Sequence, residues 1–464
     1  MIACYIYRMT DSLPPPIKLK DSIGPSFILL GLALGSGELI MWPYLVSLYG
    51  LGIIWGGLVG ITFQYFLNTE IMRYTLAYGE SVFVGWRKLG KLIPIWFIFS
   101  TVIPWALPGF ASSSATILNH VFPILPVRWT AVSLLILTGL IISSGKTLYK
   151  TMEKVQKTLL MIGVPFVAIL TFYMARGIDW YNLLQGLVGQ GEGWRFFPPG
   201  IAIGAFLGAF AYSGGGGNLN LAQSYYIKEK GFGMGKYGHG IKSLLQNRVR
   251  PVRLDGKIFT LSASNLAKWR LWWRLVTVEH GIVFWGVGLL TIIMLAVLSA
   301  SSAQGLNSQG GLEFLFNEAK MIGLATWPFV GSLFLVVGAL MLFTTQLGVL
   351  ESATRITSEN FLLARHSPHE PVQASYTFYV FLWLEILLGV IYLIFGTGEP
   401  RALLTLGAIL NAAAMGIAFP LILFLNRRLP SFIRPSPLRQ LILITAFSFF
   451  AYFVYETIRT AHWY

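Results

Sequence analysis

Charged residues are scarce in this chain of 464 residues, where they make up only 11% of the sequence. A water-soluble globular domain typically carries about 25%. Cysteine is scarcer still, because Cys4 is the only one, and a lone cysteine excludes an internal disulfide. The low charge argues against a soluble protein, and the single cysteine gives no sign of a large ectodomain held by disulfides.

Catalytic motifs are also missing. The sequence has no Walker loop, no HExxH pair, no dinucleotide-binding fingerprint and no Cys/His spacing typical of a metal site. The glycine run at residues 214–217 lacks the lysine that follows in a phosphate-binding loop. We therefore expect that the chain is not an enzyme and holds no resident cofactor.

Apolar residues dominate what is present, at 55% of the chain. Runs of about 17 to 25 apolar residues are long enough to cross a bilayer as a helix. The sequence contains eleven such runs, at residues 24–47, 51–77, 92–119, 128–144, 158–176, 199–226, 277–300, 327–360, 374–396, 402–425 and 439–460. They predict an all-α integral membrane protein with about 11 transmembrane helices.

Basic residues outnumber acidic ones, 34 to 19, which gives a net charge of +15. Most of the lysines and arginines lie in the N-terminal segment and in alternate loops, which face the same side of the membrane as the N-terminus. Cytoplasmic loops of membrane proteins retain lysine and arginine. We expect a multi-pass protein of the cell membrane with a cytosolic N-terminus and an external C-terminus. Glu70 and Arg73 are then an interfacial ion pair at the cytosolic end of the second span. No nucleic-acid-binding module accompanies the charge, so the expected partners are a small ion or solute and membrane lipid. The oligomeric state is left open.

The spans divide the chain into segments that match a repeated architecture. These are a cytosolic N-terminal segment, two repeats of five helices and an eleventh helix with the C-terminus, at residues 1–23, 24–176, 199–425 and 439–464. A cytosolic loop at residues 228–274 interrupts the second repeat. We expect its last part to lie at the membrane interface with Trp269, Trp272 and Trp273 at headgroup level, and we assign the loop no chemistry.

Two of the apolar runs are interrupted at their middle. The first carries Gly35, Ser36, Gly37 and Glu38, and the sixth carries four glycines between Ser213 and Asn218. Each glycine costs on the order of 1 kcal/mol in a helix interior. Unpaired backbone in a membrane is tolerated only where protein buries it or it lines a cavity.

The interruptions fall at matching positions, five helices apart. Glycines spaced by four residues are common at helix contacts in membranes, so packing is an alternative explanation of the first interruption. A carboxylate at midspan such as Glu38 usually marks an ion or substrate path. Together they predict a 5+5 inverted repeat whose first and sixth helices unwind at the midplane to form a binding site.

The residues from "IGPSFILLGLALGSGE" to the eleventh span resemble the Nramp (natural-resistance-associated macrophage protein) family of metal-ion transporters, within the leucine-transporter-type superfamily. The family's Asp-Pro-Gly-Asn in the first helix falls on residues 35–38 here. Its Met-Pro-His in the sixth helix falls on Gly216, Gly217 and Asn218. The resemblance implies the same scaffold with changed ligands, so this chain is similar to divergent members called Nramp-like.

The changed ligands predict a changed preference. The family's methionine thioether favours transition metals, whereas oxygen ligands favour hard cations such as Mg²⁺ and Ca²⁺. With glycine in place of methionine, we expect an oxygen cage that also includes backbone carbonyls and admits a partly hydrated divalent cation. Its members are Gly35, Ser36, Gly37, Glu38, Ser213, Gly216, Gly217 and Asn218.

Other intramembrane polar residues are expected to have secondary roles. Glu351 and Arg355 lie four residues apart on one helix face, which predicts an ion pair, with gating as the alternative. Glu385 and Asn411 could reach the cavity from the ninth and tenth helices. The third span has no titratable residue and Asn218 cannot titrate, so we expect no obligatory proton symport, unless Glu351 or Glu385 supplies a route.

The prediction from sequence is thus a secondary transporter that moves a divalent, hard metal cation by alternating access. Two alternatives remain. One is a carrier of an amino acid or other small organic solute on the same fold, and the other is a membrane receptor or scaffold that does not transport.

Overall fold

The computed structural model describes residues 12–105, 107–144, 147–242, 251–306, 312–396 and 400–460. Within these ranges, nine helices are long and apolar enough to cross a membrane. A shorter apolar helix, α9 (Val127–Ser143), adds another crossing, and a further one is divided into pieces between residues 203 and 230. The protein is therefore the predicted all-α integral membrane protein with about 11 transmembrane segments.

The first five crossing segments follow the short helix α2 (Leu19–Ser22). In order, they are α3 (Pro25–Ala33) with the π-helix η1 (Leu34–Met41) and α4 (Trp42–Tyr49), then α5 (Trp55–Tyr78) after the turn η2 (Leu51–Ile53), then α7 (Ile93–Trp105) with α8 (Gly109–Val121), then α9, then α10 (Leu148–Met174). Helix α6 (Val82–Leu89) joins the second and third segments, and Ser81 caps its N-terminus. Outside the spans are α11 (Gly177–Gly186) and the paired strands β1 (Gln190–Gly191) and β2 (Trp194–Arg195).

The second half repeats this pattern. Its members are α12 (Ile203–Ala211) with η3 (Gly217–Ala222) and α13 (Gln223–Lys230), then α14 (Ala263–His280) with the π-helix η5 (Gly281–Val287) and α15 (Gly288–Ser302), then α17 (Pro328–Arg365), α18 (Ala374–Phe395) and α19 (Pro400–Arg427). The short η4 (Gly233–Tyr237) follows α13, and α16 (Glu313–Ala325) precedes α17. After η6 (Ser431–Ile433), α20 (Pro437–Thr460) is the last crossing.

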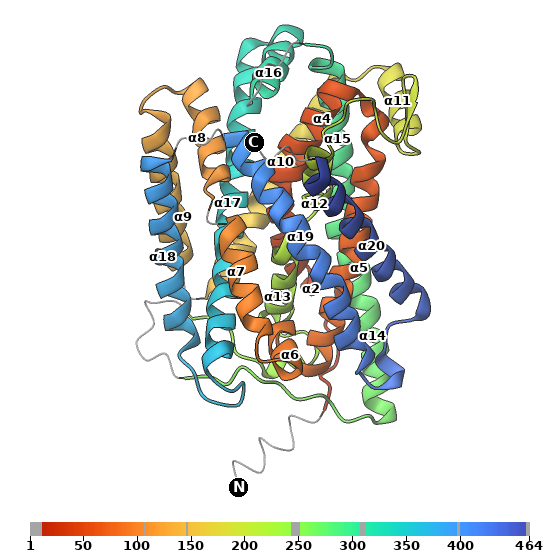
Figure 1. Cartoon of the computed structure of the whole chain (residues 1–464), viewed down its shortest axis with the longest axis vertical. Helices are drawn as coiled ribbons and strands as arrows, with labels where there is room; N and C mark the ends of the chain where they lie inside the picture. The colour runs from red at the N-terminus through yellow and green to blue at the C-terminus, as the bar shows by residue number, and fades with distance from the viewer. Residues whose placement is uncertain are drawn as a thin grey trace.

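The helices form one bundle (Figure 1). Helices α9 and α18, which are the fourth members of the two repeats, lie together at one edge, and α17 packs inside against α3, α7 and α8. Helices α11 and α16 lie at one end of the bundle and α6 lies at the other. We call the end that carries α6 the basic end, since Arg87 and Lys88 lie in the last turn of α6. It is the end that the sequence predicts to be cytosolic.

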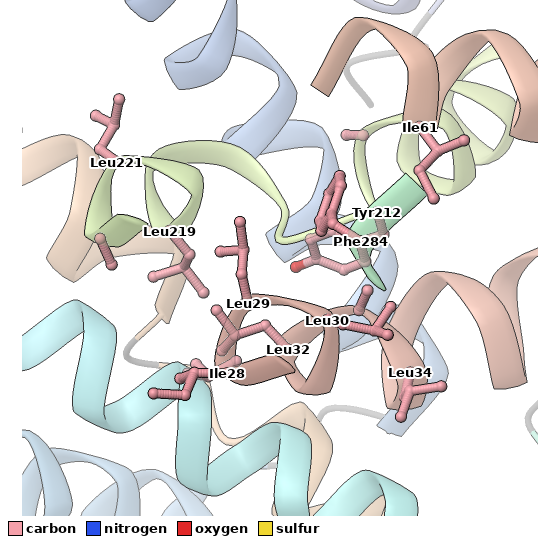
Figure 2. Close-up of a cluster of buried hydrophobic side chains, with 14 of the residues drawn as sticks. Ile28, Leu29, Leu30, Leu32, Leu34, Ile61, Tyr212, Leu219, Leu221 and Phe284 are labelled. Atoms are coloured by element: carbon pink, nitrogen blue, oxygen red, sulfur yellow. The ribbon is translucent and has the colours of Figure 1, made fainter. Parts of the chain in front are cut away.

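The outward faces of the spans expose large apolar side chains. Examples are Leu140, Ile169, Phe172 and Leu384, with exposed fractions of 54%, 69%, 67% and 46%. Soluble proteins rarely expose extensive apolar surface, whereas a lipid environment favours it. Inside the bundle, a buried apolar cluster joins the first, second, sixth and seventh crossing segments (Figure 2).

Two segments differ from the sequence prediction. The seventh crossing helix begins at Ala263, so part of the expected loop 228–274 is helical. Trp269 and Trp272 are buried within the protein, and the Trp272 indole N–H donates to the carbonyl of Pro14 at 2.8 Å. Trp272, together with Asn265, which accepts from the Leu13 N–H at 3.2 Å, attaches the N-terminal segment to α14, a contact between distant parts of the chain that hydropathy does not report.

The third span also differs, because it is not one helix. Helix α7 ends at Trp105 and α8 starts at Gly109, next to Pro108. Proline cannot donate a backbone hydrogen bond and disturbs the residue before it, so the two prolines of "IPWALPG" account for the interruption. A third interrupted span therefore lies in the bundle besides the two that the glycines predict.

Candidate functional site

The interruptions of the first and sixth spans lie against each other. A Cβ atom placed on Gly37 would overlap the carbonyl oxygen of Tyr212, so only glycine permits this contact. Five residues after Gly37, the Trp42 indole N–H donates to Oγ of Ser213, the residue that follows Tyr212, at 2.9 Å. The predicted meeting of the two interrupted helices is therefore present at the level of the backbone.

The interruption of the first span is a π-helix rather than an extended stretch. Residues Leu34–Met41 follow the π pattern, which widens the helix and is common at functional sites. Thr345 of α17 supports this widening. Its hydroxyl accepts from the Gly35 N–H at 2.9 Å and donates to the Gly31 carbonyl at 3.1 Å. A neighbouring helix thus satisfies backbone groups that the widened turn would leave unpaired.

Glu38 lies in this π-helix and is fully buried. Neither carboxylate oxygen has a hydrogen-bond partner among the described residues. Oε1 lies 3.6 Å from the position that a Cβ on Gly288 would take, and that position is also next to Leu30 and Ile61. The carboxylate therefore faces the seventh segment and the apolar cluster of Figure 2.

The interruption of the sixth span is a break in the helix, between Ala211 and Gly217. Gly216 and Gly217 have φ values of +75° and +53°, a region that glycine adopts at little cost. Gln64 of α5 replaces the lost helix bonds. Its amide donates to the Ala211 carbonyl at 3.0 Å and accepts from the Gly216 N–H at 3.4 Å and from Asn220 Nδ2 at 3.0 Å.

Sequence reasoning missed Gln64. The available signal was an amide side chain in the middle of the apolar second span, "ITFQYF". It also missed Met415, whose Sδ lies 3.4 Å from Asn220 Nδ2. The sixth segment has no methionine at the family's position, but the tenth segment brings a thioether to the same break.

Asn218 and Asn411 lie beside the break on its other side. Asn218 Nδ2 donates to Ser100 Oγ and Thr101 Oγ1 of α7, at 2.8 and 3.0 Å. Asn411 reaches the site as expected, because a Cβ on Gly217 would overlap its side-chain oxygen. The Oδ1 atoms of Asn218 and Asn411 have no hydrogen-bond partner among the described residues.

An aromatic wall closes this side of the break. The rings of Trp105 and Tyr212 stack with centroids 5.8 Å apart, and Phe110 lies 6.2 Å from Trp105. Trp105 is the last residue of α7, so the break of the third span meets the break of the sixth. The site is thus built from three interrupted segments, supported by α5, α17 and α19.

The structure brings most of the predicted site residues together, but not as a closed cage. Gly35, Gly37 and Glu38 lie on one side, and the sixth-span residues lie on the other. No hydrogen bond joins Glu38 to Ser213 or Asn218. The Ser36 side chain lies outside the described part of the chain. Among the described residues, no group of three or more His, Cys, Asp or Glu side chains could hold a metal ion.

Glu351 and Arg355 form the predicted ion pair. The pair is larger than expected because Glu229 of α13 also binds the Arg355 guanidinium, with one of its contacts at 3.2 Å. Tyr226 donates to Glu351 at 2.8 Å. All four side chains are buried. We call these four residues the α13–α17 lock, since they join the sixth and eighth segments toward the basic end.

Glu385 does not reach the central site. It is half-buried on α18 and accepts a hydrogen bond from Thr354 of α17 at 2.8 Å. Because Thr354 directly precedes Arg355 in sequence, this hydrogen bond leaves Glu385 near the α13–α17 lock instead. The expectation that Glu385 would line the cavity with Asn411 is therefore not met by this arrangement.

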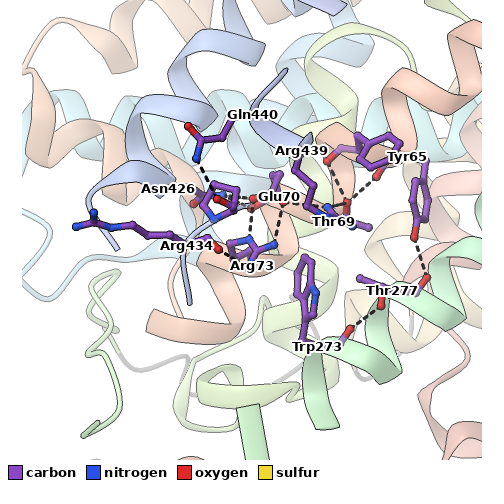
Figure 3. A network of polar contacts seen from close by, with 12 residues as sticks. Tyr65, Thr69, Glu70, Arg73, Trp273, Thr277, Asn426, Arg434, Arg439 and Gln440 are labelled. Carbon is purple, nitrogen blue, oxygen red and sulfur yellow. Dashed lines mark hydrogen bonds and ion pairs between the residues drawn. The ribbon is translucent and has the colours of Figure 1, made fainter. Parts of the chain in front are cut away.

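Glu70 and Arg73 form the expected ion pair at 2.7 Å, and both side chains are buried within the protein. Figure 3 shows the network around them, in which Arg439 and Asn426 each contact the Glu70 carboxylate at 2.9 Å. The Arg73 guanidinium also lies 3.8 Å from the ring centre of Trp273. The network fastens the second segment to the tenth and eleventh and serves a structural role at the basic end.

Comparisons with protein families and with curated protein sequences find no match to this chain. Comparison with solved structures finds proteins of similar fold. A crystal structure of a variant of the manganese transporter of Eremococcus coleocola has a TM-score of 0.70, 11% identity and coverage of 97% of this chain and 90% of that chain. The same transporter in complex with an aromatic bis-isothiourea compound has a TM-score of 0.66.

A second transporter is also similar. Mhp1, a nucleobase-cation-symport-1 family transporter in a closed conformation with bromovinylhydantoin bound, has a TM-score of 0.55 and 13% identity over 96% of this chain and 94% of that chain. At such identities the likeness shows the fold, which is the leucine-transporter type with two inverted repeats.

Proposed function

We propose that this chain is a secondary transporter, related to the Nramp group, that moves a small cation through the site between its first and sixth segments. The main observation behind this proposal is that the buried Glu38 carboxylate has no hydrogen-bond partner among the described residues. An ionised carboxylate without a partner is costly inside a membrane protein and usually belongs to an ion or substrate path. A cation at this point would supply the positive charge that the surrounding Leu30, Ile61 and Gly288 cannot supply.

The donor atoms support a hard divalent cation such as Mg²⁺. The polar atoms near the two interruptions are mostly carboxylate, amide, hydroxyl and carbonyl oxygens, which suit hard cations. The unbonded amide oxygens of Asn218 and Asn411 could accept from the water shell of a partly hydrated ion. Met415 brings a thioether to the break, and its contact with Asn220 Nδ2 occupies the sulfur.

The two ends of the site support alternating access. At the basic end, the α13–α17 lock joins the half of the sixth segment that lies beyond the break to α17. At the centre, Gly37 and Tyr212 are in contact. In the proposed cycle, the lock separates when the site opens toward the basic end, while the supporting helices α9 and α18 stay together.

A second candidate is a carrier of a small planar organic solute. The Trp105 and Tyr212 stack supports it, because aromatic faces bind planar or cationic organic groups and the nearby Asn218 and Asn411 oxygens could accept hydrogen bonds from them. The likeness in fold to a transporter with bromovinylhydantoin bound is consistent with this candidate.

Uptake into liposomes tests both candidates. We expect the reconstituted protein to take up Mg²⁺, with Ca²⁺ as a competitor, and we expect Glu38→Gln to abolish that uptake while Trp105→Phe keeps it. Manganese or cadmium uptake that a large excess of Mg²⁺ does not compete would contradict the hard-cation proposal. Uptake of nucleobases or amino acids that Trp105→Ala abolishes, without any cation flux, would establish the second candidate instead.

A further inference from the structure

The chain between α13 and α14 returns to the bundle at its basic end. Two described parts of it, residues 239–242 and 251–256, lie against the start of α18. We call these residues the strap. The strap belongs to the connection between the sixth and seventh segments, yet it contacts the turn between the eighth and ninth. The sequence alone assigns it no role.

Backbone hydrogen bonds hold one part of the strap to the turn before α18. Val252 and Val372 are partners in an antiparallel bridge and exchange two N–H to carbonyl bonds, at 3.0 and 2.9 Å. The Pro368 carbonyl accepts from the N–H groups of Leu254 and Asp255 at 3.3 and 3.2 Å. This part of the strap therefore adds a short strand beside the beginning of the ninth segment.

The other part of the strap contacts both α18 and the α13–α17 lock. The Lys242 N–H donates to Ser375 Oγ at 3.1 Å. The Ile241 N–H donates to Glu229 Oε1 at 3.3 Å, and Glu229 binds Arg355 within the lock. The strap is therefore bonded directly to a member of the lock while it is docked on α18.

A cavity of about 40 Å³ lies between the strap and the lock, large enough for a few water molecules. Glu229 and Arg355 of the lock line it, together with Ser358 of α17. Strap residues 239–241 and 252–254 complete its wall. The docked strap thus covers the lock.

This cover matters because the ion pairs of the lock are buried. The Arg355 and Glu229 side chains are 1% and 5% exposed. Attraction between opposite charges weakens as water enters and the effective dielectric constant rises. A docked strap therefore keeps the lock tight, and an undocked strap would admit water to the contact between Glu229 and Arg355.

The strap is held less firmly on α18 than its continuation is held on α14. Within the described strap, only Leu254 is buried. Beyond it, Phe259 is buried and stacks on Trp269 of α14, with ring centres 5.7 Å apart. The Gly256 N–H also donates to the buried Glu80, between α5 and α6, at 2.6 Å. Segments with few buried apolar contacts open locally at low cost, so the strap can leave α18 while its end stays anchored.

We propose that the strap holds the α13–α17 lock shut and must leave α18 before the transport path opens toward the basic end. This inference rests on the proposed transport cycle, in which α13 separates from α17. The strap continues from α13 through η4, so a docked strap ties the sixth segment to the α17–α18 turn at a second place. Undocking removes this tie and exposes the lock to water.

Alkylation of a buried thiol in the full chain measures undocking without any transported solute. Ser358 lines the cavity and is 3% exposed, so Ser358→Cys in a Cys4→Ser background reports access to the lock. Val252→Pro removes the N–H that donates to Val372, whereas the matched control Val252→Ala keeps it. We expect Val252→Pro to raise the rate of alkylation by a maleimide about tenfold, and Val252→Ala to leave it unchanged. Equal rates in the two variants would overturn the proposal.

A distance measurement shows whether the lock opens when the strap leaves. Spin labels are placed at the exposed Lys236 of η4 and Tyr376 of α18, by substitution with cysteine in the Cys4→Ser background. We expect Val252→Pro to add a longer distance and Val252→Ala to keep the wild-type distance. Faster alkylation without a longer distance would contradict the proposal, because the strap would then cover the cavity without holding the lock. Neither measurement uses ion uptake, so a failure of the proposed function is seen separately.

A milder variant decides the outcome if Val252→Pro does not fold. Asp255→Ala combined with Ser375→Ala keeps every backbone N–H of the strap. It removes the carboxylate that lies 2.9 Å from His369 Nδ1 and the hydroxyl that accepts from Lys242. We expect this double substitution to speed alkylation of Ser358→Cys about threefold. An unchanged rate would overturn the proposal.

Discussion

The carbonyl oxygen of Tyr212 occupies the space that a side chain on Gly37 would need. This contact joins the interrupted first and sixth segments at the centre of the bundle. It explains why residue 37 must be glycine. It also makes the central contact testable by the smallest possible change of side chain.

Gly37→Ala should therefore damage the protein without changing its charge. The added methyl meets a backbone oxygen that cannot rotate away, so we expect a loss of about 1–3 kcal/mol in the free energy of unfolding and a loss of uptake. Thermal unfolding in detergent measures the first effect. Gly177→Ala on α11 is the control, because a Cβ there meets nothing within 4 Å. Equal stability of the two variants would refute the close contact.

Gln64→Leu should destabilise the break of the sixth segment. The substitution removes the amide N–H that donates to the Ala211 carbonyl. It also removes the amide oxygen that accepts from both Gly216 and Asn220, so all three residues lose a partner in the bundle interior. A buried polar group left without a partner costs about 1–3 kcal/mol. We expect a lower unfolding midpoint than for Gln190→Leu, an exposed position on β1. Similar midpoints would mean that Gln64 does not support the break.

Arg355→Ala should be more harmful than the loss of a surface arginine. It leaves Glu229 and Glu351 buried without a counter-charge, and breaking a buried pair in this way costs about 3–5 kcal/mol. Arg459→Ala breaks an exposed pair and should have no measurable effect. Adding Glu229→Ala to Arg355→Ala should restore part of the lost stability, and a purely additive effect would contradict the α13–α17 lock.

Glu318 lies outside the spans, and its burial predicts that the free energy of unfolding depends on pH. Burial raises its pKa to about 8 from an ordinary value of 4.5, since the charged form is poorly solvated. The folded state therefore binds a proton that the unfolded state releases, and stability falls as the pH rises between these two values. Glu318→Gln should unfold later than the wild type near pH 8 and match it near pH 4.5. A constant difference across that range would show that Glu318 is not the cause.

Much of the fold follows from the sequence because transfer into lipid depends on the composition of each span alone. The eleven apolar runs and the two glycine-rich interruptions therefore indicate the right crossing segments. The extension of α14 to Ala263 is not visible in this way, because it depends on Asn265, Trp269 and Trp272, which other parts of the chain bury.

The site is less predictable because its polar groups depend on partners from distant segments. Sequence reasoning identifies Glu38 and the glycine run, whose composition is unusual by itself. It cannot show that Glu38 faces Gly288, that Gln64 bridges the break or that Glu229 joins Arg355. Each of these relationships joins residues of different helices.

Calorimetric titration of the purified protein with Mg²⁺ tests the central claim most directly, because it measures binding at Glu38 without requiring turnover. We predict a saturable binding heat for the wild type that Glu318→Gln retains and Glu38→Gln loses. The same binding heat in Glu38→Gln as in the wild type would contradict the account.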